Sequence, residues 1–215
     1  MNLRQGMAGS VGRRSRLRVL VLSGMAGWAA VAGATSVIQD LQGKIQRHEL
    51  PAWCAYTQET PASYARAEKE RYARRYGPAW AAMHHACRGL DDLNRAASAT
   101  GDLAQRNLLK AAAREFDYVL EHAGPRYPFR PFLLVKKGTA LLRLGRRIDA
   151  LEAFQAALRA DRGYEDAYLA MAHMYAGRGD RETALLILEQ GLHFNPTSER
   201  LQAAKANLSA ADGGH

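Results

Sequence analysis

Residues 165–198 read EDAYLAMAHMYAGRGDRETALLILEQGLHFNPTS, and the preceding stretch 131–164 reads PFLLVKKGTALLRLGRRIDALEAFQAALRADRGY. Each stretch has the apolar spacing of a helix, then a short glycine-containing turn, then a second helix. The two stretches align at an offset of 34 residues, which pairs Gly145 with Gly179, Ala150 with Ala184, Phe154 with Leu188 and Leu158 with Leu192. Small and large side chains that recur at a fixed period predict helical hairpins stacked on one another.

The second stretch resembles a tetratricopeptide repeat. That family favours a fixed order of small and large side chains, which the second stretch matches with Tyr168, Met171, Ala172, Tyr175, Ala184, Leu188, Gly191 and Pro196. The first stretch matches with Leu134, Gly138, Leu141, Ala150, Phe154 and Ala157, and departs from the order at Lys137 and Arg162. The resemblance implies an all-α solenoid of helical hairpins, a non-enzymatic scaffold without a cofactor that holds a partner protein in its concave face.

The rest of the chain from residue 35 onward also reads as helical, because no stretch alternates with a period of two. Helices are expected near 61–76, 78–97, 103–123, 131–144, 147–160, 165–177, 181–194 and 198–210. Asp180 and Ser198 are expected to cap the last two helices, and Asp102 with Gln105 fits a capping box. The pair 78–97 and 103–123 is expected to form a divergent hairpin. The last helix is expected to be a polar cap, with Arg200, Gln202, Lys205 and Asn207 facing water.

The first 34 residues have the pattern of a targeting segment. They contain five arginines and no acidic residue, and an apolar run over 19–34 ends in Ala32-Gly33-Ala34. This pattern predicts a secretory signal peptide, or an N-terminal membrane anchor if the segment is retained. Twin-arginine export and an ordinary buried helix fit it less well. The protein is expected in the periplasm or at the outer face of the inner membrane. The expected division is 1–34 leader, 35–126 helical region, 127–210 repeat region with capping helix, and 211–215 flexible tail.

The net charge of +9 is concentrated in two short blocks. One is the leader, and the other is 126–147, which holds seven Lys or Arg residues and no acid. Residues 148–215 instead hold six bases and ten acids. Nucleic-acid binding would need a basic domain with interleaved aromatic residues, so nucleic acid is not an expected partner. The expected partner is a protein or peptide, with acidic character favoured by the second block.

Helix A of each repeat supplies the candidate binding residues. The resemblance implies a groove lined by Phe132, Val135, Thr139, Leu142 and Arg143, with Lys136 beside them, and by Asp166, Leu169, His173, Ala176 and Gly177. The carboxylate clamp of co-chaperone repeats, a lysine and an asparagine, is absent because Val135 and Thr139 stand at those positions. Lys136 and Arg143 would favour acidic partners. The competing interpretation is that the basic block is only a solvated helix face.

The two cysteines, Cys54 and Cys87, are expected to form a disulfide, because an exported protein meets an oxidising environment. The alternative is a zinc site that combines them with His84, His85 or His48. Without that site, the two adjacent histidines are expected to pack and hydrogen-bond within the helical pair. The sequence has no nucleophile elbow, Walker loop or zinc-protease motif, so no catalytic residue is assigned.

Together these patterns predict an exported scaffold for protein–protein interaction, with a role in cell-envelope or exopolysaccharide assembly among the functions considered. Two alternatives stay open at this point. One is binding of acidic polysaccharide or lipid headgroups through the basic block. The other is metal binding through Cys54, His84, His85 and Cys87.

Overall fold

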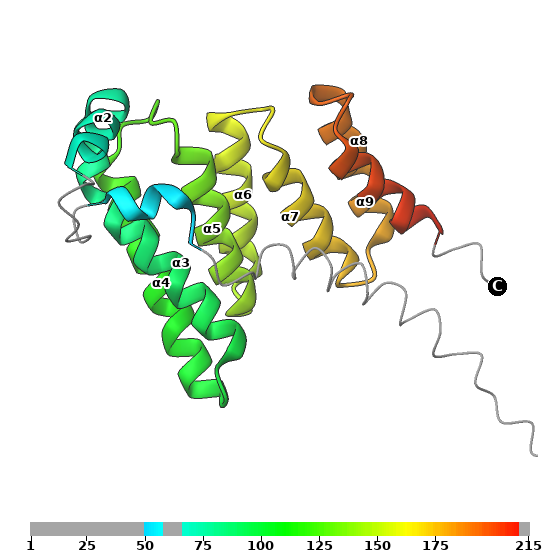
Figure 1. The fold of residues 1–215 in the computed structure, drawn as a ribbon. Coiled ribbons are helices and arrows are strands. Elements are labelled where there is room, and N and C mark those ends of the chain that lie inside the picture. The colour runs from blue at the N-terminus through cyan, green and yellow to red at the C-terminus, as the bar shows by residue number, and fades with distance from the viewer. Residues whose placement is uncertain (1–49, 58–65, 211–215) are drawn as a thin grey trace, which may run out of the picture.

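The computed structural model describes residues 50–57 and 66–210 (Figure 1). The predicted leader at 1–34, His48, and the predicted tail at 211–215 lie outside these residues. Within the described ranges, none of the helices combines the length and the apolar character needed to cross a bilayer.

The described chain is all-helical, as predicted. In chain order its elements are η1 (Ala52–Tyr56), α2 (Arg66–Tyr76), η3 (Pro78–Ala82), α3 (Met83–Ser98), α4 (Asp102–His122), α5 (Arg130–Arg143), α6 (Arg147–Ala160), α7 (Glu165–Ala176), α8 (Arg181–Phe194) and α9 (Glu199–Ala210). From α4 onward each helix begins and ends within one residue of its predicted bounds. The single helix predicted over 78–97 is wrong, because its first turn is the 3-10 helix η3 and the α-helix begins only at Met83.

The helices form two layers. The hairpins α3/α4, α5/α6 and α7/α8 stack in chain order and α9 closes the end (Figure 1). We call α3, α5, α7 and α9 the A row, and α4, α6 and α8 the B row. Successive A-row helices touch one another, whereas the described chain has no contact of similar extent between B-row helices. The solenoid therefore bends toward the A row, which forms its concave side, and the B row is splayed apart on the convex side.

A close approach of glycine to an aromatic ring sets the spacing inside each hairpin. A Cβ atom added to Gly138 of α5 would lie 2.7 Å from Cδ1 of Phe154 in α6. A Cβ atom on Gly191 of α8 would lie 2.9 Å from Cγ of Tyr168 in α7. Phe154 is fully buried, and Tyr168 is 1% exposed. The repeat positions that demand a small residue are therefore those where a ring of the partner helix occupies the side-chain space.

Two of the three predicted helix caps are present. The Asp180 carboxylate accepts a hydrogen bond from the Thr183 N–H at 3.1 Å, and the Ser198 hydroxyl accepts one from the Leu201 N–H at 3.2 Å. The predicted capping box at α4 is wrong. The N-cap residue is Gly101, which has no side chain that could accept a hydrogen bond from the first turn. Asp102 lies in the first turn and pairs with Arg106, while the Gln105 amide donates to the Ala96 carbonyl.

Candidate protein-binding surface

A disulfide fixes the segment that precedes the solenoid. Cys54 of η1 and Cys87 of α3 are bonded, with their Cα atoms 5.8 Å apart. Because this bond uses both thiolates, they are no longer ligands for the alternative zinc site. Among the described residues, no group of three or more His, Cys, Asp or Glu side chains is placed to hold a metal ion.

The two adjacent histidines instead make contacts within the α3/α4 hairpin and with the preceding η3. His85 Nδ1 lies 2.5 Å from Glu115 Oε2, and its ring packs on Tyr118 with centroids 3.9 Å apart. His84 Nδ1 lies 2.9 Å from the Ala81 carbonyl oxygen, and its ring packs on that of His85. These contacts agree with the prediction that the two histidines pack and hydrogen-bond inside the protein.

Aromatic rings hold η1 over one end of the A row. The Trp53 ring lies 6.0 Å from the Trp80 ring, 5.6 Å from Phe129 and 6.2 Å from Phe132, measured between centroids. Phe132 opens the predicted groove on α5, so the chain's own η1 already covers that position. The described part of the A row beyond Phe132, toward α7 and α9, has no ring contact with Trp53.

Two of the predicted groove residues form its floor. Val135 is 5% exposed and Leu169 is 7% exposed, so neither offers much surface to a partner. Thr139 on α5 and His173 on α7 are half-buried, and the Thr139 hydroxyl donates to the Val135 carbonyl. Thr139 and His173 lie on successive A-row helices. Among the predicted groove residues, they are the two with partly accessible polar side chains and no ion pair in the described chain.

The two cations expected to attract an acidic partner are largely engaged inside the molecule. The Lys136 ammonium lies 5.4 Å from the centre of the Phe132 ring, and burial lowers the pKa of Lys136 although Asp166 opposes the shift. The Arg143 guanidinium donates to the Leu93 carbonyl of α3 at 3.0 Å. Both side chains tie neighbouring elements together, so their charge is only partly available to a ligand.

The basic block 126–147 does not form one surface patch, contrary to the sequence-based expectation. Arg130 donates to the Leu120 and Ala123 carbonyls at the end of α4. Lys137 pairs with Asp117 of α4, and Arg146 pairs with Asp149 of α6. Consecutive helix positions point about 100° apart, so a run of bases along one helix is distributed around it. The structure therefore gives no support to the alternative of polysaccharide or lipid binding through a single basic patch.

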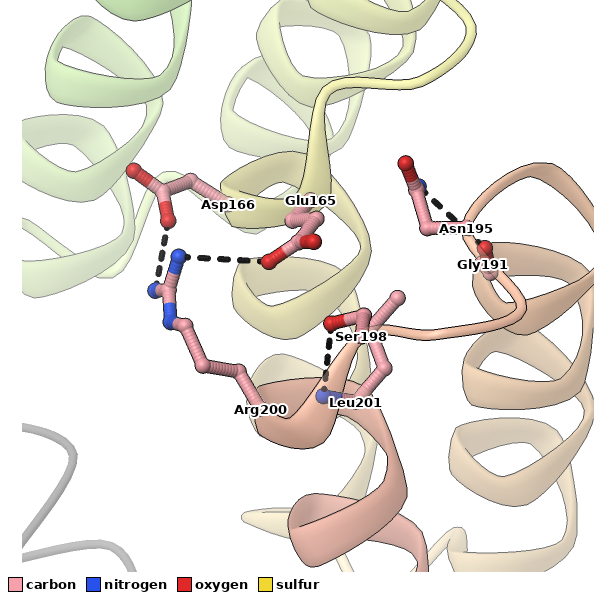
Figure 2. A network of polar contacts seen from close by, with 7 residues as sticks. All are labelled: Glu165, Asp166, Gly191, Asn195, Ser198, Arg200 and Leu201. Carbon is pink, nitrogen blue, oxygen red and sulfur yellow. Dashed lines mark hydrogen bonds and ion pairs between the residues drawn. The ribbon is translucent and has the colours of Figure 1, made fainter.

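An ion-pair network that the sequence reading did not identify joins α9 to α7 (Figure 2). Arg200 lies 2.6 Å from Asp166 and 3.5 Å from Glu165. Arg200 and Asp166 are 34 residues apart and so occupy the same position in successive units. The repeat length could have indicated this pair. The predicted polar cap is correct in composition, but Arg200, Gln202 and Lys205 bind neighbouring residues rather than only water.

We expect Arg200→Ala to lower the free energy of unfolding by about 1 kcal/mol, because two partly exposed ion pairs are each worth about 0.2–1 kcal/mol. Urea unfolding measures this loss, and Arg178→Ala, an exposed site in the α7–α8 turn, is the control with little expected change. If Asp166→Ala cost the same with and without Arg200, the two residues would not be coupled and the network would contribute nothing.

His173 should make stability depend on pH. Burial lowers the pKa of His173 from its ordinary value of 6.5. As the pH falls through about 6.5, the unfolded chain binds a proton that the folded chain resists, so folding stability decreases. We expect the unfolding free energy to fall between neutral and mildly acidic pH, and His173→Gln to reduce that dependence. An unchanged pH profile in the variant would show that His173 does not contribute.

Comparison with known proteins agrees with this architecture. A family model described as tetratricopeptide repeat matches residues 141–208, from inside α5 to near the end of α9. The comparison with curated proteins gave no match. Repeats of this family generally act as non-catalytic scaffolds that bind protein partners. With hairpins stacked in two layers and a 34-residue spacing carried by Asp166 and Arg200, residues 141–208 form a tetratricopeptide repeat region.

Proposed function

We propose that this protein is an exported scaffold that binds a polypeptide along the open part of its A row. The observation that carries the proposal is the position of Thr139 and His173. They lie at equivalent positions, 34 residues apart, on successive helices of the concave side, with Val135 and Leu169 as an apolar floor. Concave repeat surfaces of this kind capture extended peptides or helices.

The charge of this surface favours a partner without strong net charge. Lys136 and Arg200 are balanced by the nearby carboxylates of Glu165 and Asp166. An acidic partner would gain little affinity at this surface, because its attraction to the two cations would be offset by repulsion from the two carboxylates. Recognition at the A row would then depend on shape, apolar contact and hydrogen bonds to Thr139 and His173.

Export is supported by two independent features. The leader pattern over 1–34 predicts translocation, and the Cys54–Cys87 disulfide is a bond that persists mainly in oxidising compartments. We place the protein in the periplasm or at the outer face of the inner membrane. A role in cell-envelope or exopolysaccharide assembly stays a prediction from the same reasoning.

Substitution of both half-buried polar residues tests the binding surface. Quantitative affinity purification from the native compartment would compare the wild-type chain with Thr139→Arg/His173→Arg. The control is Gln155→Arg, an exposed site on α6 in the B row. We expect the A-row variant alone to lose a defined set of proteins while it stays folded by circular dichroism. Recovery of the same proteins by all three chains would contradict the proposal.

Thiol labelling tests the export claim. We expect maleimide to label neither cysteine in chain taken directly from its native compartment, and to label both after reduction and unfolding. A version without residues 1–34 should stay in the reducing cytoplasm and react without a reductant. Labelling of the full chain before reduction, together with its recovery from the cytoplasm, would contradict export.

A further inference from the structure

A second groove lies on the opposite side of the solenoid from the A row. It runs between α4 and α6 over the outward face of α5 and has a volume of about 580 Å³. It exists because the B-row helices are splayed apart while the A-row helices touch. The predicted binding residues Thr139 and His173 are not among its lining residues, so it is separate from the surface proposed above.

The floor of this groove is apolar. Ala113 of α4, Leu134 and Leu141 of α5, and Ala153 of α6 are each no more than 8% exposed. Ala156 and Leu144 add half-buried apolar surface at the edge. Small residues on the two walls leave room above the leucines, so an incoming apolar side chain could be covered on three sides.

The walls carry an excess of positive charge. Of the five cations that line the groove, Lys137 and Arg146 are neutralised by Asp117 at 2.5 Å and by Asp149 at 2.7 Å. Lys110 on one wall and Arg159 on the other are exposed and have no ion-pair partner within the described chain. Arg114 is exposed and lies near Asp92 of α3, where burial raises the pKa of the carboxyl and Arg114 opposes that shift. Glu152 is the one lining acid that no cation pairs at salt-bridge distance in this part of the chain.

We propose that this convex groove between α4 and α6 binds an acidic amphipathic helix of a partner protein. An apolar stripe of that helix would lie on the half-buried Leu144 and Ala156, which line the groove together with the buried Leu134 and Leu141. Acidic residues on its two flanks would face Lys110 and Arg114 on one side and Arg159 on the other. A helix presents such a stripe and flanks through its three- and four-residue spacing. A free polyanion would use the cations but would leave the apolar floor unoccupied.

A designed peptide tests the groove directly. The probe is a fluorescein-labelled, lactam-stapled peptide with a leucine stripe flanked by glutamates. Two matched peptides have lysine for every glutamate or serine for every leucine. Fluorescence anisotropy with the full oxidised chain would compare Lys110→Glu/Arg159→Glu with Arg147→Glu/Arg178→Glu. The latter variant makes the same change in net charge at exposed positions outside the groove.

We expect the groove variant to bind the acidic peptide at least about tenfold more weakly than the wild-type chain. The control variant should change the affinity less than about twofold, because salt screens charges that lie far from the bound peptide more than charges that face it. The lysine and serine peptides should both bind more weakly than the probe. Thr139→Arg/His173→Arg should leave probe binding unchanged. Failure of the groove proposal can therefore be distinguished from failure of the proposed A-row binding surface. Equal binding by both reversal variants would overturn the proposal. Equal binding of the serine peptide would do so too, since it would indicate simple polyanion binding.

Discussion

Gly138→Val is expected to destabilise the protein by about 3 kcal/mol, as overpacking of a rigid core costs about 1–3 kcal/mol and valine adds more than a single methyl group. Even the first added atom would lie 2.7 Å from Cδ1 of Phe154. Phe154 is fully buried between α5 and α6, so its ring can move only if the two helices separate. Separation would also disturb the stacking of α7, which contacts both helices. Urea unfolding followed by circular dichroism measures the loss.

Gly124→Val is the matched control for this experiment. A Cβ atom on Gly124 meets no atom within 4 Å, so we expect its unfolding free energy to stay within about 0.5 kcal/mol of the parent. Phe154→Leu should recover part of the loss when it is combined with Gly138→Val, since the shorter side chain vacates the contested space. An equal loss in the Gly138 and Gly124 variants would mean that the ring contact does not set the helix spacing.

Loss of the disulfide is expected to cost about 3–4 kcal/mol, the chain-entropy value for a bond that closes a loop of this size. The bonded cysteines are 33 residues apart, and Cys87 is 8% exposed in the core of α3. Cys54→Ser/Cys87→Ser would also free η1, whose Trp53 packs on Trp80 and Phe129. Tryptophan fluorescence during urea unfolding therefore reports on the same cluster that the bond holds in place.

Reductant provides the internal control for the disulfide prediction. It should lower the urea midpoint of the wild-type chain to that of the double variant and leave the double variant unchanged. Because a solenoid transmits stability mainly between neighbouring units, hydrogen exchange should increase most in α3 and α4 and least in α8 and α9. An unchanged midpoint on reduction would contradict a stabilising role for the bond.

The sequence predicted features that depend on a few neighbouring residues. The 34-residue period gave the hairpin register, and Asp180 and Ser198 cap their helices as expected because a cap bonds within three residues. Asp102 follows the same local rule and fails, because Gly101 takes the N-cap position and Gln105 bonds to α3 instead. Whether a side chain bonds locally or across a hairpin depends on packing that the local pattern does not contain.

The distribution of charge required the three-dimensional structure. Lys136 and Lys137 are adjacent in sequence, yet one lies over Phe132 on the A-row side and the other pairs with Asp117 of the B row. Arg143 is a groove residue by repeat position but reaches across to the Leu93 carbonyl. The groove between α4 and α6 is built by three helices at once, so no single stretch of sequence could reveal it.

Site-specific photocrosslinking in the native compartment tests the central claim that the A row is the protein-binding face. A photoreactive amino acid would replace His173 on α7 in one chain and Gln155 on α6 in another. The account predicts a discrete crosslinked protein from position 173 and none of that identity from position 155. The same adduct from both positions, or an adduct from position 155 alone, would contradict it.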